Sequence, residues 1–356
     1  MPVPKVLVVI ADSSQTGAPA QVKYLVTSLK DRLDFICLCP SGYLADELKS
    51  IDVTVALMPA AGRIAQTASL AETIHKFQPN IVHAHGVRAG LIAGEVFRRP
   101  QTSQLIYTEH LWTADYFLKN PLRQFVQLYL LRRMAKKAKK VVAVSRAVAD
   151  FLIAKRIVPK EKCQVIYNAI EPIEPVTPSA EPVIGTLGSL NKMKGTELIL
   201  LAAHQLKTTY PNLKIRIMGD GPERTSLEKL SRELELKTEL LGAGSSESLR
   251  PFFQSLRVYI QPSFSESFGL STLEAMSAGL PVVVSRAGAL SELVSDDDSG
   301  LTFKRGDPRS LSEALFRMLG DKALYERIRQ RGLEVAGGFT LEKMSLQYYQ
   351  LYQSLI

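Results

Sequence analysis

The chain has 356 residues, which is too long for one ordinary core and fits two domains. With 46% hydrophobic and 22% charged residues, and no apolar run near the ~18 residues that span a bilayer, the composition is typical of a soluble globular protein. Three cysteines are too few for a disulfide framework, and the N-terminal run VLVVIA is too short for a signal-peptide core. We therefore expect a reduced, cytoplasmic protein.

The net charge of +9 is unevenly distributed along the chain. Residues 1–170 hold 23 Lys and Arg residues against 12 Asp and Glu residues, so the whole positive excess lies in the first half. An anionic partner should therefore meet that half.

Strands and helices alternate through residues 1–170, which predicts a doubly wound α/β domain. A first strand at 5–11 is followed by a loop and a helix at 21–33, an arrangement that cradles phosphate groups in such sheets. Thr16 and Gly17 lie in this loop. Further strands are expected at 35–39, 53–57, 80–86, 104–107, 140–145 and 162–167, and further helices at 70–77, 86–96 and 146–154.

Three histidines occur at or after strands of this domain. His83 and His85 alternate along the strand that follows Pro79, so both lie on one face of it. Such a pair could bind a metal, but no carboxylate or cysteine nearby completes a ligand set, and we expect no metal site. His110 follows the next strand, at a carboxyl end where doubly wound sheets bind ligands. The alternative for His110 is a partly buried, hydrogen-bonded structural histidine.

The segment 116–140 combines an apolar stripe with a run of positive charge. The stripe has helical spacing and consists of Leu118, Leu122, Phe125, Val126 and Tyr129. No acid accompanies the basic residues, which are Lys119, Arg123, Arg132, Arg133, Lys136, Lys137, Lys139 and Lys140. Such a helix binds an anionic membrane surface, at up to ~1 kcal/mol per basic residue. Nucleic acid is a competing partner, disfavoured because no nucleic-acid motif is recognised; a helix that only solvates its outer face is the third interpretation.

The proline-rich segment 171–182 predicts a semi-rigid linker between a first domain, 1–170, and a second domain, 183–339. The second domain opens with a strand and a glycine-bearing loop before a helix at 196–207. Strands are expected at 214–218, 239–242 and 257–261, and helices at 247–255, 308–319 and 321–332. A last helix is expected at 340–356, with Met344, Tyr348 and Leu351 on one face.

Residues 262–300 carry the densest pattern in the chain. After Pro262, a polar Ser-Glu-Ser-Phe-Gly loop leads to the N-terminus of a helix at 270–278, which suits a phosphate. Glu266 in the loop and Glu274 in the helix add two carboxylates that can accept hydrogen bonds from vicinal hydroxyls of a sugar or ribose. The alternative is a solvated loop acid and a helix surface charge. Against this, Glu274 stands in an otherwise apolar helix, a costly place for a carboxylate without a task.

The sequence ESFGLSTLEAMSAGLPV resembles the signature of the retaining glycosyltransferases of family 4. The matching residues are Glu266, Phe268, Gly269, Glu274, Ala275, Met276, Gly279, Pro281 and Val282. The resemblance implies the GT-B fold, in which two Rossmann-like doubly wound domains face each other across a cleft and the C-terminal helix crosses back to the first domain. It also implies transfer of a sugar from a nucleotide-diphosphate donor with retention of anomeric configuration.

The resemblance assigns roles to individual residues. The segment Gly188–Gly195 is similar to the family's diphosphate-binding loop, except that Ser189 stands where an arginine is expected, and a hydroxyl does not replace a guanidinium. The donor-binding residues implied are Thr16, Gly17, Gly188, Ser189, Lys194, Gly219, Leu241, Glu266, Ser267, Phe268, Gly269, Leu270 and Glu274. The implied acceptor-side residues are His85 and His110, and the implied catalytic residues are His110, Lys194 and Glu266.

The expected activity is a hexosyl transfer to an acceptor hydroxyl, with a UDP-sugar favoured as donor, a GDP-sugar as the alternative, and no cofactor or metal required. The basic helix favours a lipid-linked or membrane-bound saccharide acceptor in polysaccharide or glycolipid biosynthesis, and a protein peripheral to the inner face of the cytoplasmic membrane. The membrane-facing residues expected are Lys119, Arg123, Arg132, Arg133, Lys136, Lys137 and Lys140. Two rival functions are a GT-B nucleotide-sugar epimerase and a non-catalytic nucleotide- or nucleic-acid-binding protein.

Overall fold

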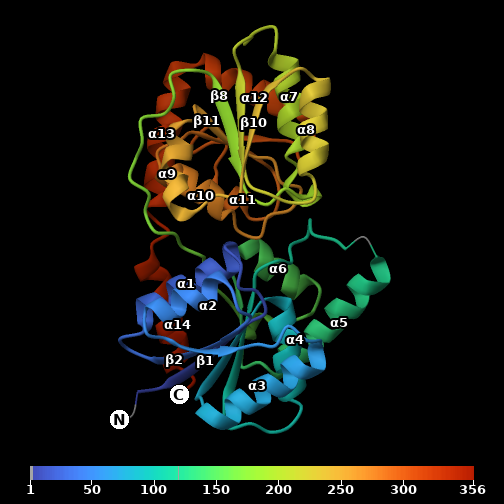
Figure 1. Ribbon diagram of the computed structural model, residues 1–356, viewed down its shortest axis with the longest axis vertical. Helices are drawn as coiled ribbons and strands as arrows, with labels where there is room; N and C mark the ends of the chain where they lie inside the picture. The colour runs from blue at the N-terminus through green and yellow to red at the C-terminus, as the bar shows by residue number, and fades with distance from the viewer. Residues whose placement is uncertain (1–2, 119) are drawn as a thin grey trace. The chain divides into compact units, whose positions relative to one another are not determined.

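The computed structural model describes residues 3–118 and 120–356, so the prediction for Lys119 lies outside the described residues. The chain forms two units (Figure 1). Unit 1 contains the residues up to Ala169 together with Thr340–Ile356, and unit 2 contains Ile170–Phe339.

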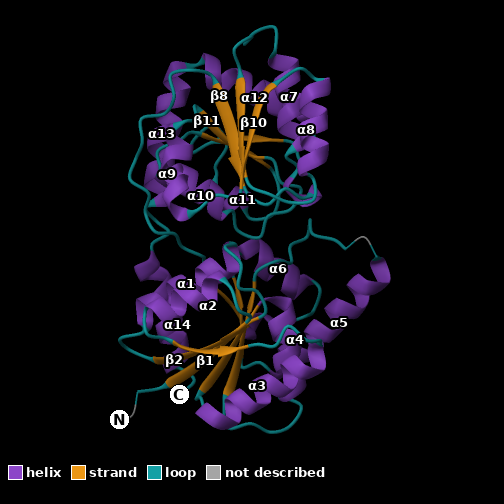
Figure 2. Cartoon of the chain, in the orientation of Figure 1, coloured by secondary structure: helices purple, strands orange, loops and turns teal. Residues whose placement is uncertain are grey.

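Unit 1 is built on a seven-stranded parallel sheet in the order β3-β2-β1-β4-β5-β6-β7. Its strands are β1 (Lys5–Ile10), β2 (Asp34–Cys39), β3 (Thr54–Leu57), β4 (Ile81–His85), β5 (Gln104–Glu109), β6 (Lys140–Ala143) and β7 (Cys163–Val165). The central strands are near-continuous apolar runs because helices cover both of their faces (Figure 2). The strand order reverses between β1 and β4, and ligands bind at such a point, outside the carboxyl ends of the strands.

The helices of unit 1 are α1 (Gly17–Leu29), α2 (Tyr43–Ser50), α3 (Arg63–Phe77), α4 (Gly86–Val96), α5 (Pro121–Lys137), α6 (Arg146–Ala154) and α14 (Leu341–Gln353). Although α14 follows unit 2 in the sequence, it packs against α1. Met344, Tyr348 and Tyr352 of α14 are buried in the same core as Val22 and Leu25 of α1. The predicted return of the C-terminal helix to the first domain is confirmed.

Three helices begin at different residues from those expected: α3 begins at Arg63 instead of residue 70, and α1 and α5 differ as follows. Thr16 is the extended N-cap of α1, and Pro19 falls in the first turn, where its missing N–H costs no hydrogen bond. Gly17 therefore starts the helix instead of lying in a loop. In α5 the side chain of Asn120 accepts a hydrogen bond from the N–H of Arg123 at 3.1 Å, and Pro121 occupies the first helical position.

Small residues on α4 let α5 approach closely over part of its length. A Cβ atom at Gly90 would lie 2.6 Å from the Tyr107 ring of β5 and 3.2 Å from Met134 of α5, and one at Gly94 would lie 3.0 Å from Met134. The buried residues of α5 are all in its C-terminal half, Leu131, Met134 and Ala135. The N-terminal half consequently has few contacts with the rest of unit 1 and extends away from the sheet (Figure 1).

Unit 2 repeats the doubly wound plan with a six-stranded parallel sheet in the order β10-β9-β8-β11-β12-β13. Its strands are β8 (Val183–Leu187), β9 (Lys214–Met218), β10 (Lys237–Gly242), β11 (Val258–Gln261), β12 (Val282–Ser285) and β13 (Leu301–Phe303). Its α-helices are α7 (Glu197–Leu206), α8 (Arg224–Glu233), α9 (Ser246–Gln254), α10 (Leu270–Ser277), α11 (Leu290–Leu293), α12 (Pro308–Gly320) and α13 (Lys322–Ala336). The order reverses between β8 and β11, and the two doubly wound sheets confirm the predicted α/β class.

The proline-rich segment 171–182 lies along unit 2. The N–H of Val176 donates to the carbonyl of Ala278 at 2.9 Å, and the N–H of Ser179 donates to the carbonyl of Leu256 at 2.9 Å. A guanidinium N–H of Arg329 donates to the carbonyl of Val176 at 3.1 Å. These bonds attach the segment to the unit that it precedes.

Candidate functional site

Three glycine turns meet at the carboxyl ends of β8, β9 and β10. The N–H of Gly188 donates to the carbonyl of Met218 at 3.0 Å, and the N–H of Gly219 donates to that of Gly242 at 2.7 Å. Gly219 has a φ of 147°, and a Cβ atom there would lie 1.8 Å from the Gly188 carbonyl oxygen. Only glycine permits this approach. The structure thus brings together the predicted residues Gly188 and Gly219, and Leu241 lies just beyond them with 47% of its surface exposed.

Lys194 and Glu266 form an ion pair beside these turns. Lys194 ends a short 3-10 helix, η2 (Lys192–Lys194), and its Nζ lies 2.7 Å from Oε2 of Glu266. Ser263 Oγ donates to the same oxygen at 3.1 Å, and Gln261 Nε2 does so at 3.4 Å. The Tyr259 hydroxyl donates to Gln261 Oε1 at 2.7 Å and so fixes the amide. Glu266 is held in place through Oε2, while Oε1 accepts no hydrogen bond from the described residues.

The sequence analysis assigned no role to Gln261 or Ser263. A signal was present, because Gln261 is a polar residue in an otherwise apolar strand directly before Pro262. Its partners, however, depend on the loop conformation, which the strand pattern does not predict.

The loop that carries Glu266 leads into an open helix terminus. Gly269 caps α10 with a φ of 104°, and no side chain within the described chain caps this terminus. The first-turn N–H groups are thus left for a ligand, and they lie at the positive end of the helix. Phe268, directly before Gly269 in the sequence, is buried, and its ring centroid lies 5.7 Å from that of Phe339. Ser267 and Leu270 complete the turn.

Gly288 and Ala289 pack against the backbone of the loop that carries Glu266. The N–H of Ala289 donates to the Glu266 carbonyl at 2.9 Å, and a Cβ atom at Gly288 would lie 2.0 Å from that carbonyl oxygen. A larger residue at this position would displace the backbone that positions Glu266.

Glu274 lies one to two turns into α10. Its carboxylate makes no hydrogen bond and no ion pair with any described residue, while burial raises its pKa to about 7. The pKa of nearby Tyr259 is also raised, first by burial and then by the charge of Glu274. A carboxylate without partners in a desolvating environment is costly unless a ligand supplies hydrogen-bond donors.

Ser189 is exposed at the tip of the β8 loop and accepts a hydrogen bond from the Asn191 amide at 3.0 Å. A hydroxyl therefore stands at the chain position where the family resemblance placed a guanidinium. The ammonium of Lys194 is the cation that the described residues bring next to Glu266.

In unit 1, Thr16 and Gly17 follow β1 at the point where the strand order reverses. Asp12, which the sequence analysis did not single out, accepts hydrogen bonds from the N–H of Ser14 at 2.9 Å, from its hydroxyl at 2.7 Å and from the hydroxyl of Thr16 at 3.2 Å. A carboxylate at this helix start disfavours a phosphate there and favours a neutral, hydroxyl-bearing group.

Three histidines form a chain in the interior of unit 1. His110 Nε2 lies 3.1 Å from His85 Nδ1, and His85 Nε2 lies 3.2 Å from His83 Nδ1. The chain ends on α14, because the Tyr352 hydroxyl lies 2.7 Å from His83 Nδ1. Thr108 Oγ1 lies 2.7 Å from His83 Nε2. The structure therefore connects the predicted acceptor-side residues His85 and His110 to a buried network that includes His83 and Tyr352.

The histidine chain is neutral. Burial lowers the pKa of His83 to about 3 and that of His110 to about 4, and it lowers the pKa of His85 well below its usual value. A neutral imidazole has one donor and one acceptor nitrogen, so the tautomer of each ring constrains its neighbour. Glu109, next to His110, is fully buried and accepts a hydrogen bond from the Tyr107 hydroxyl at 2.5 Å.

No group of three His, Cys, Asp or Glu residues suited to a metal ion occurs among the described residues. None of the described helices is both long and apolar enough to cross a membrane.

Comparison with known proteins connects both units to sugar-transferring proteins. A profile described as "Glycosyltransferase Family 4" matches residues 16–173, and one described as "Glycosyl transferases group 1" matches residues 169–335. The fold resembles the crystal structure of HepE from Anabaena, in complex with UDP and glucose, with a TM-score of 0.85 and 20% identity. That similarity covers 99% of this chain and 100% of HepE.

Curated relatives match over shorter stretches. A D-inositol 3-phosphate glycosyltransferase of Corynebacterium urealyticum is 34% identical over 187 residues, which are 50% of this chain and 44% of the relative. The lipopolysaccharide core biosynthesis glycosyltransferase LpsE of Rhizobium meliloti is 30% identical over 179 residues, 50% of this chain and 52% of the relative. The matches thus span about half the length of these curated relatives.

The two doubly wound units, together with the return of α14 to unit 1, define the GT-B class of folds. The two profiles between them cover both units, and the chain belongs to the family 4 glycosyltransferases. The predicted family and fold class are confirmed.

Proposed function

We propose that this protein transfers a sugar from a UDP-sugar to an acceptor hydroxyl, with retention of the anomeric configuration. The observation that carries the proposal is the carboxylate of Glu274, desolvated and without a protein partner, on the helix whose N-terminus is open. The two hydroxyls of a ribose would supply its missing donors.

Unit 2 would hold the donor. The diphosphate would lie against the first turn of α10 and the ammonium of Lys194, where negative charge develops as the leaving group departs. Glu266, fixed through Oε2, would accept hydrogen bonds from the sugar through its free Oε1. HepE has been described in complex with UDP-glucose, which favours UDP over GDP as the nucleotide.

Unit 1 would serve the acceptor. His110 would contact the acceptor, and the chain through His85 and His83 would fix its tautomer. The carboxylate of Asp12, held by Ser14 and Thr16, would accept hydrogen bonds from hydroxyls of the acceptor. Both groups recognise hydroxyls better than phosphates, as an acceptor-binding unit requires.

The acceptor would be lipid-linked, and the protein would bind an anionic membrane surface. Large apolar side chains on and before α5 are exposed, namely Phe117 at 60%, Leu122 at 70%, Phe125 at 69%, Val126 at 45% and Tyr129 at 52%. The four on α5 recur at the predicted spacing, beside Arg123, Arg132, Arg133, Lys136 and Lys137. An apolar stripe bordered by cations is typical of helices that lie in a membrane interface. One curated relative acts in lipopolysaccharide core biosynthesis by its name, which agrees with such an acceptor.

Donor binding tests the first part of the proposal. Glu274→Gln should bind UDP-glucose more weakly than the wild type by calorimetry, and it should release less UDP in an assay with an acceptor lipid extract. Glu233→Gln, which makes the same exchange at an exposed position of α8, is the control. If neither UDP- nor GDP-sugars bind, the protein is not a transferase of this kind. If the sugar changes configuration without an acceptor, by NMR of the products, the epimerase alternative is correct.

Vesicle flotation tests the membrane part. The variant Leu122→Ser/Phe125→Ser should lose binding to vesicles that contain phosphatidylglycerol, because it removes apolar surface from the stripe. Phe316→Ser, at an exposed position of unit 2, is the control. Wild-type protein that stays unbound at every salt concentration would contradict the membrane proposal.

A further inference from the structure

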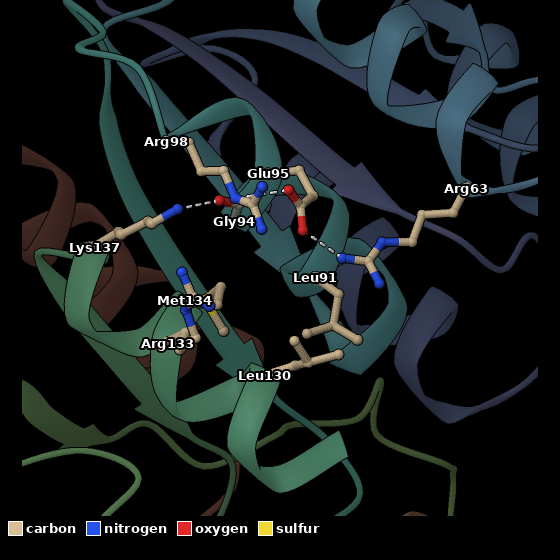
Figure 3. A pocket seen from close by; sticks show the side chains of 9 residues that line it. All are labelled: Arg63, Leu91, Gly94, Glu95, Arg98, Leu130, Arg133, Met134 and Lys137. Carbon is tan, nitrogen blue, oxygen red and sulfur yellow. Dashed lines mark hydrogen bonds and ion pairs between the residues drawn. The ribbon is translucent and has the colours of Figure 1, made fainter. Parts of the chain in front are cut away.

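A hollow lined by basic residues lies where α3, α4 and α5 meet (Figure 3). Its lining residues are Arg63 of α3, Leu91, Gly94 and Glu95 of α4, Arg98 two residues after the end of α4, and Leu130, Arg133, Met134 and Lys137 of α5. The sequence pattern treated the cations of α5 as one charged face. The structure separates them, because Arg133 and Lys137 line the hollow while Arg132 and Lys136 lie outside it.

The hollow contains four cations and one carboxylate, and that carboxylate is fully engaged. Glu95 Oε1 lies 2.7 Å from Arg63 Nη2, and its Oε2 lies 2.8 Å from Arg98 Nε. The ammonium of Lys137 donates to the carbonyl of Gly94, and Arg133 lies over the Tyr129 ring. Neither Arg133 nor Lys137 has a carboxylate partner within the hollow.

The cations of the hollow repel one another. The pKa of Lys137 is lowered, first by burial and then by the positive charge of Arg98; Arg133 adds to the effect and Glu95 opposes it. An anion between Arg98, Arg133 and Lys137 would relieve this repulsion, and a phosphate group presents the acceptor oxygens that guanidinium and ammonium groups bind.

The hollow continues the exposed stripe of α5. Leu122, Val126, Leu130, Arg133 and Lys137 follow one another at helical spacing of three or four residues, so they lie along one line of the helix. A molecule that meets both features presents an apolar part to the N-terminal half of α5 and an anionic part to the hollow. A phospholipid has this chemistry, whereas a free phosphate has only the anionic part.

We propose that this hollow binds the phosphate group of an anionic membrane lipid. The inference rests on the membrane association proposed above and adds to it a specific site, in which Arg133 and Lys137 bind the phosphate and Arg63 and Arg98, both paired with Glu95, lie beside it. The site makes the protein select for lipid phosphate instead of responding only to the average surface charge.

Two double variants with the same change of charge test the site. Arg133→Gln/Lys137→Gln removes two cations from the hollow, and Arg132→Gln/Lys136→Gln removes two exposed cations of the same helix beside it. Partitioning is measured on phosphatidylcholine vesicles with and without phosphatidylglycerol. The first pair should reduce binding to the anionic vesicles by about 30-fold, the size expected for two basic residues, and the second pair by no more than about threefold. Equal losses for the two pairs would mean adsorption by average charge and would overturn the site.

Glu95→Gln should change vesicle affinity in the opposite direction. Its result stands even if the Arg133→Gln/Lys137→Gln variant fails to fold. The Glu95→Gln substitution frees Arg63 and Arg98 for the phosphate, so binding to the anionic vesicles should become tighter. Weaker or unchanged binding by a variant with wild-type fluorescence of Trp112, the single tryptophan of the chain, would count against the site.

Inorganic phosphate, compared with chloride at equal ionic strength, distinguishes the two sources of the anion. It should compete only weakly with vesicles, because it lacks the apolar part. Strong competition, or phosphate binding by calorimetry without vesicle binding, would make this a free-phosphate site and overturn the proposal. The Leu122→Ser/Phe125→Ser variant separates this failure from that of membrane association. If this variant binds vesicles less tightly while the two cation pairs lose equally, only the site is contradicted; if it binds as the wild type does, the membrane proposal fails and the site fails with it.

Discussion

Glu274 shows how one side chain can report on ligand binding. Its raised pKa of about 7 means that its charge changes within the range where enzymes are assayed. The ionised form accepts hydrogen bonds from ribose hydroxyls through both oxygens, whereas the protonated form loses part of that capacity.

Donor affinity should therefore depend on pH through Glu274. We expect the Kd for UDP-glucose to be constant above pH 8 and to rise below about pH 7, by up to ~10-fold per pH unit. Calorimetry on the wild type and on Glu274→Gln checks this, and the variant should show a weaker but flat profile. Two profiles that run parallel would assign the titration to another group.

Ser189 marks a position where charge can be added. Because its side chain is exposed at the tip of the β8 loop, Ser189→Arg should fit without displacing other atoms, and its guanidinium should bind the diphosphate at a cost of some side-chain entropy. UDP should bind several-fold more tightly, by about 1 kcal/mol, while uridine affinity stays unchanged. Tighter binding of uridine as well would place the new side chain near the base.

At the residue scale, the sequence predicted the charged groups better than the groups that hold them. Lys194 and Glu266 are far apart in the chain, yet strand–loop–helix patterning placed both at carboxyl ends of strands, and the structure pairs them. The bonds from Ser263 and Gln261 to Glu266, and the position of Asp12, depend on loop conformations that no periodicity encodes.

Among the elements, β4 is unusual because it buries two ionisable side chains, His83 and His85, next to neutral partners. The folded protein keeps these rings uncharged, while the unfolded chain takes up protons below the ordinary pKa of 6.5. The folded pKa is the lower of the two, so each ring reduces stability as the pH falls from 6.5 toward its folded pKa and has no such effect above 6.5.

The variant His83→Gln should remove one such contribution. Its amide can still bond to Thr108, and the free energy of unfolding of the wild type relative to the variant should fall by up to ~1.4 kcal/mol per pH unit between pH 6.5 and 4. Urea unfolding followed by Trp112 fluorescence measures the difference. The raised pKa of Glu109 acts in the opposite direction but is common to both proteins. A difference that does not vary with pH would mean that His83 takes up its proton as readily in the folded protein as in the unfolded chain.

Element types were easier to predict than element ends. Long apolar runs gave the central strands of both sheets, but α2 and α8 were missed, because each is a short helix with few buried residues. The starts of α1 and α5 were misplaced because a capping residue and a nearby proline, Thr16 with Pro19 and Asn120 with Pro121, fix the first turn more strongly than apolar spacing does.

On the scale of the whole molecule, the two units have separate cores. The core of unit 1 includes α14, although α14 follows unit 2 in the sequence. Leu351→Ala should therefore destabilise unit 1 by about 2–5 kcal/mol, although residue 351 follows unit 2. Trp112, buried in unit 1, reports the loss as an earlier fluorescence transition in urea. Leu315→Ala, a similar change in the unit 2 core, should leave that transition in place; an equal shift would show that the two cores unfold together.

The position of α14 also sets the order in which the two units can complete their cores during synthesis. A nascent chain that has reached residue 339 already contains all of unit 2, yet the unit begun at its N-terminus still lacks the helix that covers Val22 and Leu25. Until Met344, Tyr348 and Tyr352 have left the ribosome, that apolar face is open to chaperones and proteases. Unit 2 is in effect an insertion within unit 1, and the first strands translated are the last to be enclosed.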